Sequence, residues 1–143
     1  MQDYSLVRTG KSNLEFHGEL IAEAKSPAYR RHEKNPTARA HWYEAYVYLT
    51  RGGKYILHVL YRFAGPLNRE ILQDYVFVHD DIDGVIQSMK EFSPTDCVTG
   101  YPDGEHWEKK QQILMNDLDG DFDLLEELIH SKLQRLKEPE RID

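Results

Sequence analysis

A chain of 143 residues, 40% of them hydrophobic, can bury the core of one domain, and we expect a single domain over residues 1–143. Its one cysteine, Cys97, excludes an internal disulfide framework and a cysteine-based zinc site. The net charge of −7 divides unevenly: residues 1–69 carry 11 Lys and Arg against 6 Asp and Glu, whereas residues 70–143 carry 7 against 19. Because no apolar segment resembles a membrane span or a signal peptide, we expect a cytoplasmic protein without membrane contact.

Residues 14–24 alternate apolar and polar side chains, which is typical of a strand with one buried face. Residues 25–40 follow, with two prolines and five basic residues. Loops of this length are uncommon in compact domains and are often functional. We therefore predict a basic loop whose cations could meet the phosphate of a ligand: Arg30, Arg31, Lys34 and Arg39.

Residues 41–63 contain two runs of β-branched and aromatic residues that flank the pair Gly52-Gly53, which predicts a β-hairpin. If the two glycines form a two-residue turn, Leu49 lies opposite Ile56. This register gives the hairpin an aliphatic face and an aromatic face. The aromatic face carries four rings that suit a flat ligand or a protein partner: Trp42, Tyr46, Tyr48 and Tyr61.

The second half of the chain predicts one more strand and then helices. Residues 71–79 form the strand, and Asp80 or Asp81 can cap the helix that follows. Apolar residues at helical spacing predict three helices, over 82–92, 105–118 and 122–137. The fold class is therefore α+β: an antiparallel sheet of about four strands in the N-terminal half, with three helices of the C-terminal half packed on one face.

The acidic run at residues 117–123 looks at first like a calcium loop. Its glycine is at the fourth position, whereas the EF-hand spacing requires a glycine at the sixth. We therefore expect no metal here, and interpret the run as a turn in which Asp119 or Asp121 caps the last helix.

The sequence shows no catalytic motif: a nucleophile elbow, a dinucleotide-binding glycine motif and a phosphate-binding loop are all absent. His58 shares its predicted face with Arg62 and Tyr43, and these three side chains could form a small polar site. Such a histidine is more often a core or rim residue with one satisfied bond. We expect no cofactor and favour a protein that is not an enzyme.

Two segments, FHGELIA at residues 16–22 and YLTRGGKY at residues 48–55, resemble the EXLDI family of small bacterial proteins. The shared pattern is F-x-G-x-L-I-A followed by Y-x-T-x-x-G-K, within the first half of the chain. The chain lacks the N-terminal ribbon-helix-helix-like segment of that family and its closing E-x-L-D-I, to which Arg141-Ile142-Asp143 comes nearest. Since the family has no assigned activity, the resemblance implies no catalytic residues.

Three functions fit these features. The first is a non-catalytic interaction domain that forms a homodimer or binds another protein through the aromatic face. The second is a binding module for a phosphate-bearing ligand or single-stranded nucleic acid, which would use the basic loop beside the aromatic rings. The third is an acidic inhibitor, from a bacterial or phage mobile element, that mimics nucleic acid. We favour the first, because one set of helices leaves the aromatic face of the sheet needing cover.

Overall fold

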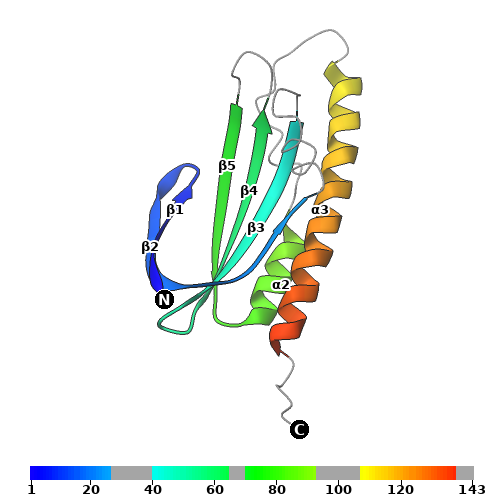
Figure 1. Ribbon diagram of the computed structural model, residues 1–143. Coiled ribbons are helices and arrows are strands. Elements are labelled where there is room, and N and C mark those ends of the chain that lie inside the picture. Colours follow the sequence, from blue (N-terminus) through cyan, green and yellow to red (C-terminus); the bar gives the residue numbers. More distant parts are fainter. Residues whose placement is uncertain (27–39, 65–69, 93–106, 138–143) are drawn as a thin grey trace.

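The computed structural model describes residues 1–26, 40–64, 70–92 and 107–137. Two helices, α2 (Ile82–Glu91) and α3 (Trp107–Lys137), lie against one face of an antiparallel sheet (Figure 1). Each strand of that sheet pairs with its neighbours in sequence, in the order β1 (Gln2–Arg8), β2 (Lys11–Lys25), β3 (Ala40–Thr50), β4 (Tyr55–Ala64) and β5 (Glu70–His79). The α+β class is confirmed, with five strands instead of about four and, in the described part of the chain, two helices instead of three.

The main hydrophobic core lies between the sheet and the helices. Tyr43 is fully buried there, and its ring centroid lies 5.3 Å from that of Tyr61 and 5.3 Å from that of Phe122 on α3. Phe92, which follows α2, stacks on Phe122 with the centroids 5.1 Å apart. These rings join both helices to the centre of the sheet.

The apolar stripes of the two helices follow the predicted spacing. Asp81 caps α2 as predicted, since its Oδ1 accepts a hydrogen bond from the Gly84 N–H at 2.7 Å. The apolar spacing over residues 122–137 predicts a buried stripe that includes Leu128 and Leu136, but these two leucines are 47% and 49% exposed at the flank and the end of α3. The other positions at this spacing are buried on both helices: Val85, Ile86 and Met89 on α2, and Phe122, Leu125, Ile129 and Leu133 on α3.

Helix α3 continues through residues 117–123, so the predicted turn and its capping aspartates are wrong. Gly120 lies inside the helix, where a Cβ would meet no atom within 4 Å. A glycine in a helix costs only about 1 kcal/mol relative to alanine. Burial of Phe122 and Leu125 directly after it offsets that cost, because each buried side chain of this size contributes about 1.5–3 kcal/mol.

The β3–β4 hairpin pairs one residue away from the predicted register. Leu49 lies opposite Tyr55 and not opposite Ile56. The loop contains three residues, 51–53, and Gly53 has a φ of 84°, the left-handed conformation that closes a three-residue loop of this type. The pair Gly52-Gly53 suits a two-residue loop and a three-residue loop equally well, so the sequence does not distinguish between them. The predicted two-residue turn is wrong.

This shift changes which residues of β3 and β4 share a face. Tyr61 lies on the helix side and is fully buried. Trp42, Tyr46 and Tyr48 lie on the opposite face, where their neighbours on β4 include His58. The predicted division of the hairpin into an aliphatic face and an aromatic face is therefore wrong. Of the four predicted rings, Trp42, Tyr46 and Tyr48 do share one face.

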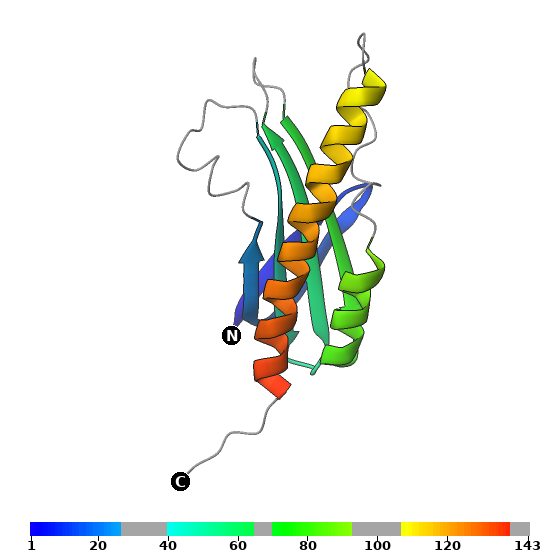
Figure 2. The same ribbon diagram turned by 90° about the vertical axis from the view of Figure 1, so that its right-hand side faces the viewer.

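Strand β1, which the sequence analysis did not predict, forms a hairpin with the first half of β2. At Gly18, strand β2 pairs with β1 on one side and with β3 on the other. The two backbones approach so closely here that a Cβ on Gly18 would lie 2.4 Å from the Leu49 oxygen. With the irregularity between Leu20 and Ala22, this bend folds the hairpin back across the face of the sheet that the helices leave open (Figure 2).

We expect Gly18→Ala to lower the free energy of unfolding by about 1–3 kcal/mol, because the added methyl group overpacks against a main-chain oxygen. Gly120→Ala is the matched control, and it should raise that free energy by about 0.5–1 kcal/mol. Urea denaturation measures both changes. A neutral Gly18→Ala would contradict the close approach, and a destabilising Gly120→Ala would contradict the continuous helix.

Candidate functional site

The β1–β2 hairpin packs on the part of the open sheet face around Tyr48 and Ile56. The ring centroid of Tyr48 lies 4.7 Å from that of Tyr4 on β1 and 5.4 Å from that of Phe16 on β2. Tyr48 is only 7% exposed as a result. Trp42 is 8% exposed and Tyr46 is half-buried. Trp42 and Tyr48 therefore do not need a second molecule to cover them.

The predicted site residues divide into three groups. The first group, Trp42, Tyr46 and Tyr48, lies on one face of the sheet, where Trp42 and Tyr46 are brought together and Tyr48 lies further along. The second is Tyr61, which lies on the opposite face. The third group falls outside the described residues: Arg30, Arg31, Lys34 and Arg39. The structure therefore joins part of the predicted aromatic set and leaves the basic loop undescribed.

Glu44 links Trp42 and Tyr46. The Trp42 Nε1–H donates to Glu44 Oε2 at 2.9 Å, and the Tyr46 hydroxyl donates to Oε1 at 2.5 Å. Burial, and then the hydrogen bond to Glu44, raise the pKa of Tyr46. The charge of Glu23 acts in the same direction. Two carboxylates beside the ring disfavour a phosphate at this place.

A buried polar cluster lies next to these rings. Asp74 Oδ1 is 2.8 Å from His58 Nε2 and 3.0 Å from Arg62 Nη2, and Asp74 Oδ2 accepts from Arg62 Nη1 at 3.3 Å. Burial alone would raise the pKa of Asp74, but the bonds from His58 and Arg62 outweigh it and leave the pKa below its ordinary value. The carboxylate is therefore ionised and paired.

His58 is buried and bonds to Asp74 through one ring nitrogen, which confirms the favoured interpretation of a core histidine with one satisfied bond. It shares a face with Arg62, whereas Tyr43 lies on the other face, so the alternative of a polar site made by these three side chains is wrong. Asp74 was missed, although an acid at an inward position of an apolar strand is a recognisable signal of a buried pair. His58 Nδ1 is buried without a hydrogen-bond partner in the described part of the chain. Because both ring nitrogens are enclosed or bonded, His58 is poorly placed to exchange a proton with a substrate.

Asp74 also fastens the tip of the hairpin through its main chain. Its N–H donates to Thr9 Oγ1 at 2.8 Å, and its carbonyl accepts from the Thr9 N–H at 3.0 Å. Thr9 lies in the turn between β1 and β2. One residue of β5 thus holds the polar cluster together and closes the hairpin over the sheet.

The outer edges of β5, β2 and β1 differ in whether another part of the chain bonds to their main chain. Thr9 occupies the middle of the β5 edge, at Asp74. Beyond the region that β1 covers, the outer edge of β2 is met by Lys132 of α3, whose amino group donates to the Glu23 carbonyl. Along β1, no hydrogen bond from the described residues reaches the outer main chain.

The outward direction of the β1 main chain follows from the pairing. The Arg51 N–H donates to the His17 carbonyl at 2.8 Å, so the main chain of His17 points toward β3 and away from β1. Asp3, which lies opposite His17, must then point its own N–H and C=O away from β2. Ser5 does the same by alternation. Both residues are exposed.

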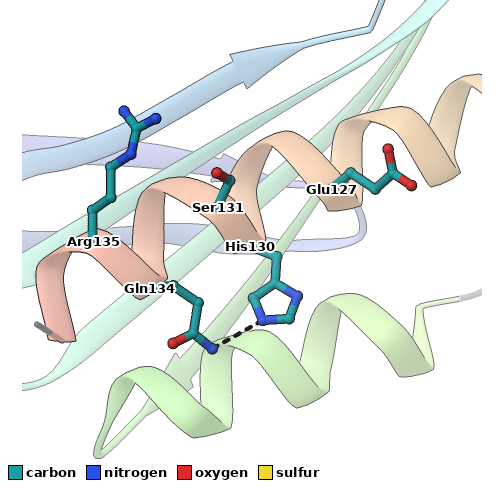
Figure 3. Close-up of a pocket in the computed structure, with 5 residues that line it drawn as sticks. All are labelled: Glu127, His130, Ser131, Gln134 and Arg135. Carbon is teal, nitrogen blue, oxygen red and sulfur yellow. Dashed lines mark hydrogen bonds between the residues drawn. The ribbon is translucent and has the colours of Figure 1, made fainter.

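The surface of the described residues has a hollow on α3 and a hollow beside β1. Figure 3 shows the first, on the outward side of α3, where side chains of one helix fan out without converging on a point. His130 and Gln134 bond to each other there at 3.0 Å, while Glu127 and Arg135 reach opposite ends. The second hollow lies beside the open edge of β1 and is lined by Asp3, Tyr4, Ser5, Glu15 and Phe16.

Among the described residues, no cluster of histidine, cysteine and carboxylate side chains could hold a metal ion. Neither α2 nor α3, within the described ranges, is long and apolar enough to cross a membrane. No family model, no curated protein and no solved structure matches the chain. The resemblance to the EXLDI family therefore stays a prediction.

Proposed function

We propose that this chain is a non-catalytic interaction domain that associates with itself through strand β1. The observation that carries the proposal is the contrast between the edges of the sheet. Thr9 caps the middle of the β5 edge and Lys132 caps the edge of β2, whereas the outer edge of β1 has no cap among the described residues. Proteins usually block such an edge, since a free row of main-chain donors and acceptors is a template for another strand.

The residues of β1 suit an antiparallel pairing of two copies. Most homo-oligomers are two-fold symmetric, and such an axis at Ser5 would place Ser5 opposite the partner's Ser5. The free main-chain groups of Asp3 and Ser5 would then bond to the second copy, and Tyr4 would lie opposite the partner's Leu6. No like charges face each other in this register, which favours it over registers that would oppose them.

The aromatic face has an indirect role in this proposal. Tyr4 and Phe16 anchor the hairpin on Tyr48, and the Thr9–Asp74 bonds fix its tip. A strand held in this way loses little conformational freedom when it binds, which favours association. The rings therefore position the binding edge and need not contact the partner themselves.

The proposal is tested with Ser5→Pro. Proline is tolerated in an edge strand where the N–H faces solvent, so the monomer should stay folded while a central donor of the interface is lost. We expect wild-type protein to show the mass of a dimer by light scattering at about 100 µM, a range suited to a small interface. We expect Ser5→Pro to remain a monomer, and Ser5→Ala, the matched control, to behave like wild type. A wild type that is monomeric throughout would refute self-association.

The two alternative functions find less support. A phosphate-bearing ligand or single-stranded nucleic acid would have to approach Trp42 and Tyr46 past the carboxylates of Glu44 and Glu23. A nucleic-acid mimic requires a uniformly acidic surface, whereas the described outward hollow of α3 mixes Glu127 with Arg135. We therefore expect added oligonucleotide to leave the measured mass unchanged.

A further inference from the structure

The outward side of α3 carries apolar side chains that the core does not use. Leu124 and Leu128 are 46% and 47% exposed. They lie one turn apart and therefore on the same side of the helix, while the buried positions of α3 face the sheet. Figure 2 shows α3 as the outer layer in front of the sheet. Both leucines thus stand in water, where burial would be favourable.

A row of three exposed residues borders the two leucines. Glu127, Ser131 and Arg135 follow one another at intervals of four residues and line the hollow on α3. Glu127 and Arg135 lie at opposite ends of the hollow, with the short side chain of Ser131 between them (Figure 3). Within the described ranges, neither charged side chain forms an ion pair. The row therefore has an acidic end and a basic end that are both open to a partner.

This row fits a reversed copy of itself. Residues four apart form ridges on a helix, and such ridges of two helices most often interlock when the axes cross at about −50°. In an antiparallel crossing at Ser131, the ridge of one copy lies along the ridge of the other in the reverse direction. Glu127 then lies beside the partner's Arg135, and Arg135 beside the partner's Glu127. A parallel crossing would bring like charges together, so the charges favour the reversed arrangement.

We propose that the outward side of α3 is a second self-association surface, on which two copies cross antiparallel at Ser131. The crossing buries Leu124 and Leu128 against the partner's ridge and joins each Glu127 to an arginine. The occupant is a second copy of this chain, because the charge pattern is complementary to its own reverse and a two-fold axis repeats the contact. This inference goes beyond the proposed function, since it uses another surface and does not require β1.

The contact is small, which sets its strength below that of the β1 contact. It contains two leucines and two exposed charge pairs, and exposed pairs contribute little. We expect a dissociation constant of about 1 mM, so the surface is mostly unoccupied at the about 100 µM used to test β1. A chain with two different self-complementary surfaces assembles beyond the dimer, because dimers formed through β1 can join through α3.

The test follows the mass of Ser5→Pro, in which the β1 contact is removed, by light scattering up to about 1 mM. We expect the mass to rise toward that of a dimer. In this background Glu127→Arg and Arg135→Glu should each weaken association by about tenfold, because two symmetric contacts become like-charged. An equimolar mixture of these two variants should restore it, since both contacts of the mixed pair again join a glutamate to an arginine.

Two further variants complete the test. Glu19→Arg is the matched control, because it changes the net charge as Glu127→Arg does but lies exposed on β2, and it should leave association unchanged. Leu128→Gln should weaken association by about tenfold, since the residue occurs twice in the contact, while the far-UV circular dichroism stays that of wild type.

The outcomes separate this inference from the proposed function. A Ser5→Pro protein that is monomeric at about 1 mM would overturn the α3 surface and leave β1 as an association edge. A mixture of Glu127→Arg and Arg135→Glu that associates no better than either variant alone would overturn the antiparallel crossing. Association of Leu128→Gln equal to that of its parent would also contradict the surface. A wild type without a dimer at about 100 µM would refute the β1 contact alone.

Discussion

Asp74→Asn is expected to lower the free energy of unfolding by about 3–5 kcal/mol, because it removes the charge that His58 and Arg62 share in a buried site. The main-chain bonds to Thr9 remain possible in this variant, so the loss reports the side-chain pairs. Asp80→Asn is the matched control. Asp80 is exposed and contacts Lys54, and its replacement should produce no measurable change. Urea denaturation at neutral pH compares the two, and equal effects would contradict the account of the cluster.

The pH dependence gives an independent check on Asp74. Its pKa in the folded protein lies below the ordinary value of 3.8, so the unfolded chain binds this proton first as the pH falls. The stabilisation is therefore fully present above about pH 5 and is lost progressively as the pH falls through 3.8 toward the folded value. We expect the wild type to lose more stability than Asp74→Asn over this interval. Parallel acid profiles would show that the pairing does not lower the pKa.

Tyr48→Ala is expected to cost about 3–5 kcal/mol, because it removes the ring on which Tyr4 and Phe16 pack. The loss should be local: amide exchange should accelerate along β1 and the first half of β2 more than at Val59 in the middle of β4. Tyr46→Ala is the control, and its cost should be smaller because the ring is only half-buried. A uniform acceleration, or equal costs for the two tyrosines, would contradict the anchoring of the hairpin by Tyr48.

The fold was predictable where the local signal is strong. The β-branched and aromatic run at residues 76–78 of β5 and the helical stripe of α2 predict both elements within one residue at each end. Strand β1 was missed because it has two inward residues, Tyr4 and Leu6, which is too short a pattern to distinguish a strand from a loop. The predicted turn at residues 117–123 is wrong because a helix tolerates the one glycine of this run, Gly120, when packing continues beyond it.

The site was less predictable than the fold, because it depends on register. His58 and Arg62 share a strand face in any register, but their contact with Asp74 depends on how β4 pairs with β5. Likewise, the rings of β3 could be recognised as needing cover. That the cover is the hairpin of the same chain follows from the bend at Gly18, where tertiary packing decides the path of β2.

The central claim, that β1 is the association edge, is tested most directly by amide hydrogen exchange at several protein concentrations. In the proposed dimer, exchange at Asp3 and Ser5 slows as the concentration rises, because their N–H groups bond to the partner strand. Exchange at Tyr4 and Leu6 is slow at every concentration, because their N–H groups bond to β2. If Asp3 and Ser5 exchange rapidly while the measured mass doubles, association uses another surface, and the claim is contradicted.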